Sequence, residues 1–193
     1  MWLLVLTIVS AALVVVVTLG SISQLSRLAV TGGWMLAVGL GIQILLDVVD
    51  VPADQLETVG YGLLMASFAF ILAFCLANFR TAGFGVIAIG VAMNALVIGL
   101  NQGMPTIDIG NDAEGNRIQK PIAVSVKHRP EQPDDLLRIL DDRILFPEPF
   151  DAVVSFGDLV VTVGICELAY FASRRRRSRR GGVSRPLSAT RGA

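Results

Sequence analysis

The stretch GFGVIAIGVAMNALVIGL, residues 83–100, decides the fold class, because Asn94 is its only polar side chain. A helix rises about 1.5 Å per residue, so roughly 20 apolar residues cross the hydrocarbon core of a membrane. On either side of this stretch, four other apolar stretches approach that length, at residues 2–19, 28–46, 59–76 and 156–172. None alternates polar and apolar residues as a barrel strand must. We therefore expect an all-α membrane bundle of five spanning helices within residues 1–173.

The composition agrees with a membrane protein. Hydrophobic residues make up 53% of the 193 residues and charged residues only 17%, and the mean hydropathy is +0.66. The formal net charge of zero hides a segregation, because eight of the 16 Lys and Arg residues follow Ser173, whereas most carboxylates lie between Asp47 and Asp158. Segregated charge of this kind orients a membrane protein.

The basic residues predict that orientation. Arg27 follows the first span, Arg80 follows the third, and the run Arg174-Arg175-Arg176-Arg177-Ser178-Arg179-Arg180 follows the fifth. Because cytoplasmic connections carry an excess of Lys and Arg, we expect the N-terminus outside and the C-terminus inside. Residues 101–151 then form an extracytoplasmic loop, and residues 174–193 form a basic, disordered cytoplasmic tail.

Two local patterns predict further structure. Small residues let helices approach closely in lipid, so Gly33, Ala37 and Gly41, at four-residue spacing, predict a packing seam on the second span. In the loop, the apolar side chains of residues 134–144 are spaced as on one face of a short amphipathic helix: Leu136, Leu137, Leu140 and Ile144.

Polar side chains gather at the predicted outer membrane face. The candidate outer-face polar site comprises Gln43, Asp47, Asn101, Gln102, Asp142 and Asp158. Ser155-Phe156-Gly157-Asp158 also fits a capping box, in which the Ser155 hydroxyl and the Asp158 carboxylate satisfy backbone N–H groups at a helix start. The sequence leaves open whether Asp158 has only this structural role. Lys127, His128 and Arg129 form a small basic cluster in the loop, which is either a contact for anionic headgroups or a solvated segment.

Two polar residues lie inside the apolar stretches. Asn94 fits an interhelical hydrogen bond. Glu167 is costly at membrane depth, so it either forms an ion pair, with Arg80 or Arg27 as the nearest partners, or carries a proton or a ligand.

The sequence offers little support for catalytic or cofactor chemistry. Cys75 and Cys166 fall in apolar stretches and His128 is the only histidine, so neither a disulfide nor a metal site is expected. Residues 108–116 lack the spacing of a calcium loop, and nucleotide-binding glycine motifs and a serine-nucleophile turn are absent from the sequence. We expect no cofactor and no catalytic residue. Nucleic acid is disfavoured because the arginine run directly follows a membrane span and has no interleaved aromatic residues.

The sequence resembles a known family at three places. Asn101-Gln102-Gly103-Met104-Pro105, then Leu140-Asp141-Asp142 and Pro147, then Val154-Ser155-Phe156-Gly157-Asp158-Leu159 resemble its pattern Asn-Gly-Gly-x-Met-Pro-Val, Leu-Gly-Asp and Ser-x-Gly-Asp. The family consists of small bacterial integral membrane proteins, actinobacterial and clostridial, catalogued as a domain of unknown function. Here Gln102 replaces the first glycine, Thr106 replaces the valine and Asp141 replaces the glycine of Leu-Gly-Asp. The resemblance implies a multi-pass protein of the bacterial plasma membrane with polar residues at the outer face, and it implies no reaction.

Three functional hypotheses follow from the sequence. The first is an accessory protein of the cell envelope that binds membrane lipid headgroups, another membrane protein or a second copy of itself through the outer loop. The second is a small proton-coupled transporter that uses Glu167, Asn94 and Gln43. The third is a membrane enzyme acting on a lipid-linked phosphate with Lys127, His128, Arg129, Asp142 and Asp158. The sequence favours binding over catalysis.

Overall fold

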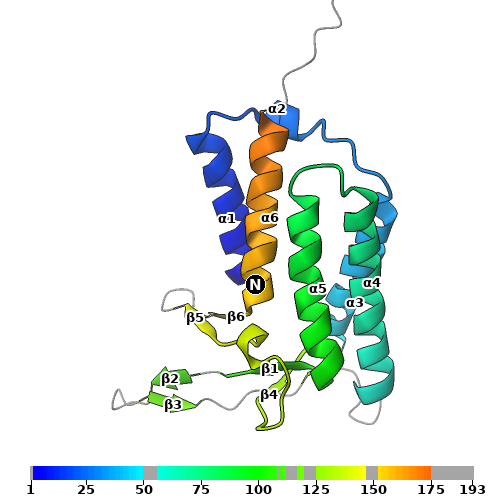
Figure 1. Ribbon diagram of the computed structural model, residues 1–193, viewed down its shortest axis with the longest axis vertical. Helices are drawn as coiled ribbons and strands as arrows, with labels where there is room; N and C mark the ends of the chain where they lie inside the picture. Colours follow the sequence, from blue (N-terminus) through cyan, green and yellow to red (C-terminus); the bar gives the residue numbers. More distant parts are fainter. Residues whose placement is uncertain are drawn as a thin grey trace, which may run out of the picture.

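The computed structural model describes residues 2–49, 56–107, 109–111, 117–119, 125–146 and 152–174. Its helices are α1 (Trp2–Val17), α2 (Ile22–Leu25), α3 (Gly33–Val48), the π-helical turn η1 (Leu56–Gly60), α4 (Tyr61–Ala77), α5 (Phe84–Asn101) and α6 (Phe156–Ser173), as Figure 1 shows. The five predicted helices are therefore present. Residues 175–193 of the predicted tail lie outside the described residues.

The largest difference in helix ends is the start of α3, at Gly33 rather than residue 28. Asn78 explains this later start, because its side chain holds the backbone at Thr31, just before α3, in a non-helical conformation. Asn78 Nδ2 donates to Thr31 O and Thr31 N donates to Asn78 Oδ1, each at 2.8 Å. Gly32 then turns the chain at a φ of 69°, a value that glycine adopts readily.

Among the described residues, three helical segments are long and apolar enough to cross a membrane: Thr58–Ala77, Phe84–Asn101 and Phe156–Ser173. Val5–Val17 and Gly33–Val48 are apolar but shorter. Their large apolar side chains are widely exposed, as Leu13 at 60% and Ile44 at 62% illustrate. Five spans remain a prediction, while the apolar helices themselves are confirmed.

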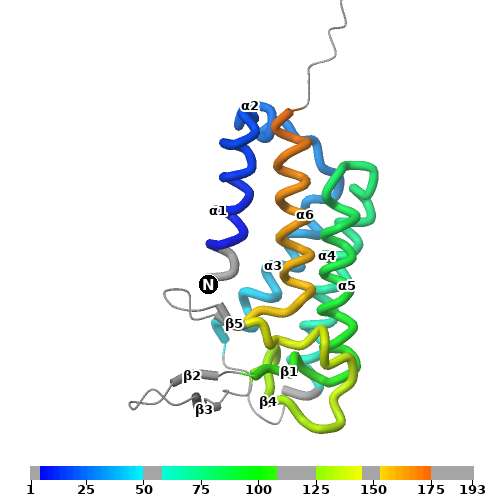
Figure 2. Tube along the Cα trace, turned by 60° about the vertical axis from the view of Figure 1, so that its left-hand side comes forward, coloured from blue at the N-terminus to red at the C-terminus, as the bar shows by residue number. Residues whose placement is uncertain are grey.

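The spatial order of the helices differs from their order in sequence. α1 packs on α6, α6 on α5, α5 on α4, and α4 on α3. Figures 1 and 2 show α6, the last helix of the described residues, between α1 and α5. The C-terminal helix therefore joins the first helix to the rest of the bundle.

Glycines allow the closest of these contacts. A Cβ atom on Gly90 of α5 would lie 2.6 Å from Gly157 O of α6, and one on Gly164 would lie 2.7 Å from Ile87 N. The predicted seam on α3 is wrong, because a Cβ atom added to Gly33 or Gly41 would meet nothing within 4 Å, whereas one on Gly39 would approach the backbone of α4. The spacing of small residues marked the right helix but the wrong face.

In the part of the chain that the structure describes, six short strands lie at one end of the bundle, so the structure is mostly helical rather than all-α. β1 (Met104–Thr106) pairs in parallel with β4 (His128–Pro130). Antiparallel pairs join β2 (Ile109–Asn111) to β3 (Arg117–Gln119) and β5 (Ile144–Phe146) to β6 (Ala152–Val154). Only the β1–β4 pair joins residues far apart in sequence, Met104 with His128, whereas the other two pairs are local hairpins that were missed by sequence reasoning.

The predicted amphipathic helix over residues 134–144 is wrong. Only a 3-10 turn, η2 (Arg138–Leu140), forms there, and Leu137 before it has a φ of 58°. The Asn101 side chain exchanges two hydrogen bonds of 2.9 Å with the backbone of Leu136, which holds this segment against the end of α5. A tertiary contact therefore replaces the local helix.

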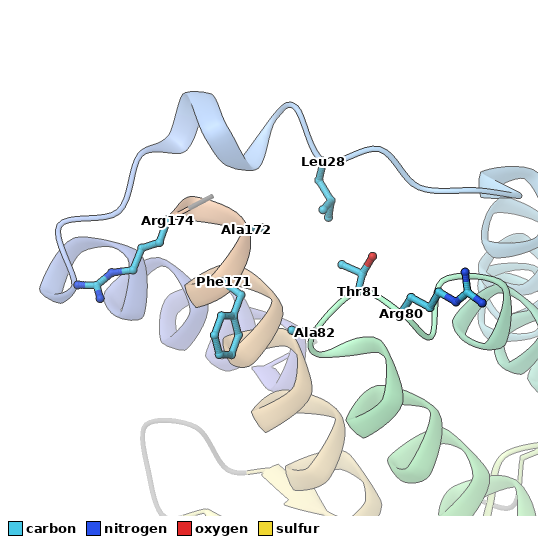
Figure 3. A pocket seen from close by; sticks show the side chains of 7 residues that line it. All are labelled: Leu28, Arg80, Thr81, Ala82, Phe171, Ala172 and Arg174. Atoms are coloured by element: carbon cyan, nitrogen blue, oxygen red, sulfur yellow. The ribbon is translucent and has the colours of Figure 1, made fainter. Parts of the chain in front are cut away.

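Two basic residues, Arg80 and Arg174, lie at the end of the bundle opposite the strands. Leu28, Arg80 and Arg174 line one pocket there, together with Phe171, Ala172, Thr81 and Ala82. Figure 3 shows that Arg80 and Arg174 extend away from its centre in opposite directions. Arg174 donates instead to Thr18 O at 2.7 Å and to the Tyr170 hydroxyl at 3.0 Å. This pocket therefore presents mainly apolar side chains.

Candidate functional site

A cavity of about 260 Å³ lies where the strand end of the bundle meets the loops. Helices α3, α4, α5 and α6 and strands β1 and β4, which converge at this end in Figures 1 and 2, contribute side chains to it. We call it the polar cavity, and its lining residues are Gln43, Phe68, Asn94, Ile98, Met104, Lys127, His128, Asp142 and Asp158.

The start of α6 brings Asp158 to the cavity. The Ser155 hydroxyl accepts from Asp158 N at 3.0 Å, and Asp158 Oδ2 accepts from Ser155 N at 3.2 Å, which confirms the predicted capping box. Asn94 Nδ2 on α5 donates to Asp158 Oδ1 at 2.8 Å, and the Ser155 hydroxyl donates to Asn94 Oδ1 at 3.0 Å. A carboxylate is also stabilised at a helix N-terminus. Asp158 thus caps α6 and lines the cavity at once.

Asp142 reaches the cavity from the loop through backbone pairing. Asp142 N donates to Pro105 O at 3.1 Å, and Ile107 N donates to Asp142 O at 3.0 Å. The Thr106 hydroxyl donates to Asp142 Oδ2 at 3.3 Å. Burial, followed by the nearby negative charge of Asp158, raises the pKa of Asp142 to about 7. At neutral pH the Asp142 carboxyl is therefore divided between its two protonation states.

His128 lies beside Asp142, with its Nε2 atom 3.4 Å from Asp142 Oδ2. Burial and the positive charge of Lys127 lower the pKa of His128, although Asp158 and Asp47 oppose the shift. The imidazole is consequently neutral at pH 7. A neutral imidazole next to a carboxyl group can accept or pass on a proton.

Lys127 is the cation of the cavity, and it is already paired. Its Nζ atom lies 2.8 Å from Asp47 Oδ1 and donates to Gln43 O at 3.4 Å. The Gln43 side chain in turn donates to the Ser67 hydroxyl at 3.2 Å. Because Asp47 is more exposed than Lys127, this ion pair lies at the rim of the cavity.

The structure therefore brings together residues that the sequence placed in three separate groups. Six of the predicted site residues line one cavity: Gln43, Asn94, Lys127, His128, Asp142 and Asp158. Asp47 contacts the group through Lys127. The remaining predicted residues lie elsewhere.

Asn101, Gln102 and Arg129 have structural positions outside the cavity. Asn101 holds the loop at Leu136, and Gln102 ends α5 with a φ of 54°. Arg129 donates to Asn101 O at 2.8 Å and forms an ion pair with the buried Asp135. The side chains of Asn101 and Arg129 are therefore occupied in holding the loop against the helices.

Glu167 lies nine residues beyond Asp158 on α6, which is about 13 Å along the helix axis. In the part of the chain that the structure describes, no ion pair joins Glu167 to Arg27 or Arg80. The set proposed for proton transport is thus divided, with Asn94 and Gln43 at the cavity and Glu167 away from it.

Several residues of the site were missed by sequence reasoning. Phe68, Ile98 and Met104 form its apolar wall, and Ser67 and Thr106 orient Gln43 and Asp142. Apolar residues inside apolar stretches give no signal that separates a cavity wall from a lipid-facing surface. Within the described ranges, no three His, Cys, Asp or Glu side chains are grouped as metal ligands.

Comparison with known families assigns the chain to one of them. Residues 27–170 match the model of a family of unknown function, DUF5317, and the chain belongs to that family. Neither a curated protein nor a solved structure matches the chain. The matched range includes every residue that lines the polar cavity.

Proposed function

We propose that this chain spans a membrane five times and binds a lipid headgroup in the polar cavity at its extracytoplasmic end. The observation that carries the proposal is the gathering of six polar side chains, from helices and loops distant in sequence, around one cavity at the end of apolar helices. Arg80 and Arg174 at the opposite end support the orientation, because basic residues favour the cytoplasmic side.

The position of the cavity favours a headgroup over a soluble partner. Asp158 lies in the first turn of α6, and Asn94 lies two turns before the end of α5. The cavity therefore adjoins the level at which apolar helices give way to polar loops, where lipid headgroups lie. Its wall of Phe68, Ile98 and Met104 offers apolar contact beside the polar groups. Its volume of about 260 Å³ suits a small polar group.

Quantifying the lipid that remains bound to the purified protein tests the proposal. The protein is extracted in a mild detergent, washed free of loose lipid and examined by native mass spectrometry. We expect one phospholipid to remain bound to the wild-type chain and to be lost from Asp158→Ala, since a charge-assisted hydrogen bond contributes roughly 1.5–3 kcal/mol. Arg138→Gln is the matched control, because Arg138 pairs with Glu131 and does not line the cavity. Equal retention by wild type and Asp158→Ala would refute the proposal.

A second candidate function is hydrolysis of a lipid-linked phosphate. The distance of 3.4 Å between His128 Nε2 and Asp142 Oδ2 favours it, because these groups can accept a proton from an attacking water. Lys127 offers a positive charge to the phosphate. Release of inorganic phosphate from lipid phosphates by wild type, and its loss in His128→Gln, would select this function over binding alone.

A further inference from the structure

The two carboxylates of the polar cavity, Asp142 and Asp158, retain capacity to accept further hydrogen bonds. Asp158 uses each carboxylate oxygen once, and Gln43 uses its amide N–H as a donor to Ser67. Asp142 Oδ2 is engaged by Thr106, whereas Asp142 Oδ1 receives no hydrogen bond from the described residues. The Asp142 side chain is only 7% exposed, so a donor on a ligand would reach its second oxygen from within the cavity. A ligand that fits must bring hydrogen-bond donors.

The charges of the cavity favour a positive group as that donor. Lys127 is compensated by Asp47, and the neutral His128 adds no charge. The Asp158 carboxylate and the ionised fraction of Asp142 then leave the cavity negative. An ammonium group would compensate this charge, whereas a headgroup with only phosphate and hydroxyl groups would bring further negative charge into it.

The side chains that line the polar cavity also distinguish a primary from a quaternary ammonium. A primary ammonium has three N–H donors for the oxygens of Asp142 and Asp158, whereas a quaternary ammonium has none and is bound by cages of aromatic rings. Phe68 is the one aromatic ring that lines the cavity among the residues the structure describes. A quaternary headgroup would therefore leave the carboxylates without hydrogen bonds.

We infer that the polar cavity selects the headgroup of an aminophospholipid of the phosphoethanolamine type, with the ammonium at Asp142 and Asp158 and the phosphate at Lys127. This inference rests on the proposed function and adds the class of headgroup. Lys127 supplies a third N–H beyond its contacts with Asp47 and Gln43, and a phosphate oxygen accepts it. The ammonium of the ligand thus donates to the carboxylates, and its phosphate accepts from Lys127.

The test is a lipid competition in nanodiscs that contain equal amounts of phosphatidylethanolamine, phosphatidylglycerol and phosphatidylcholine. Native mass spectrometry after release counts the lipid that stays with the protein. We expect phosphatidylethanolamine to be enriched roughly tenfold or more over the other two, the factor for one charge-assisted hydrogen bond. Asp142→Asn lowers the enrichment, because the amide keeps the shape and removes the charge. Arg138→Gln leaves it unchanged.

A second variant guards against misfolding of Asp142→Asn, whose backbone belongs to the loop pairing. Lys127→Gln removes the phosphate contact, so phosphatidylethanolamine retention falls while the ammonium contacts remain. Soluble phosphoethanolamine at increasing concentration displaces the bound lipid if the headgroup alone is recognised. Asp142→Asn and Lys127→Gln thus test the ammonium and the phosphate of the ligand separately, and soluble phosphoethanolamine tests the headgroup without its acyl chains.

The outcomes distinguish the inference from the proposed function. Cavity-dependent retention of phosphatidylglycerol or phosphatidylcholine would overturn the aminophospholipid and leave headgroup binding intact. Binding of soluble phosphoethanolamine without any retained lipid would overturn the proposed binding of a membrane lipid and keep the inferred chemistry of the ligand. Lipid retention that none of the cavity variants changes would overturn both.

Discussion

Replacing Gly90 by alanine would insert a methyl group where α5 and α6 touch. The new Cβ would lie 2.6 Å from Gly157 O and 2.7 Å from Val161 N, and neither backbone atom can rotate away. The helices must therefore separate, and overpacking of this kind costs roughly 1–3 kcal/mol. Because each kcal/mol shifts the melting temperature of a chain of this size by about 2–4 °C, we expect a decrease of roughly 2–12 °C in a thermal unfolding assay in detergent.

The same substitution should weaken the polar cavity. Asn94 lies one turn after Gly90 on α5, and its 2.8 Å hydrogen bond to Asp158 crosses the same interface. Separation of the helices lengthens this bond, so lipid retention should fall together with stability. Gly41→Ala on α3 is the control, because a Cβ there meets nothing within 4 Å. If Gly90→Ala and Gly41→Ala melt at the same temperature, the close packing of α5 on α6 does not support the fold as argued.

Three further predictions concern other parts of the molecule. Asn78→Ala removes hydrogen bonds to Thr31 and Phe74 and should destabilise the protein by about 1–3 kcal/mol in thermal unfolding, without changing lipid retention, since it lies at the far end from the cavity. Asp142 has its pKa raised to about 7 on folding, so its contribution to stability is present below the unfolded pKa of 3.8 and is lost as pH rises through about 7. Unfolding of the lipid-free protein at pH 5 and pH 8 should show this loss, and Asp142→Asn should reduce it to the part that Asp141 contributes, because burial raises the pKa of Asp141 to about 6. The charged or titratable groups around Asp142 are Asp158 on α6, His128 and Lys127 on the β4 side, Asp141 and Asp47. In a chain freed of native cysteines, Gln102→Cys should react with an impermeant reagent from outside intact cells and Arg80→Cys only after lysis; the reverse pattern would contradict the orientation.

The helices could be predicted from sequence because each depends on the length of one apolar stretch. Gly83 to Leu100 has the composition of a spanning helix wherever it packs, and α5 formed within one residue of the expected ends. The loop could not be predicted, because its backbone is fixed by partners far away in sequence. Thr106 pairs with Asp142, and Asn101 holds Leu136, so the local helical spacing of leucines there was overridden.

The candidate site could be predicted as residues but not as an arrangement. Polar side chains in apolar surroundings, such as Asn94, are visible in sequence because membranes make them costly. Which of them meet depends on α6 packing against α5, and glycine spacing indicates that a helix can approach closely without indicating its partner. Asp158 shows the limit most clearly, since the sequence pattern of a helix cap fits equally well whether or not the carboxylate also faces a cavity.

The position of α6 between α1 and α5 has a consequence for biosynthesis. A ribosome completes α1, α3, α4 and α5 before α6 exists, so the first helix lacks its packing partner until α6 has been made. The segments from Gly33 to Asn101 can already pair with one another during this interval. Asp158 arrives only with the final helix, so a nascent chain released before that point lacks the carboxylate that completes the cavity.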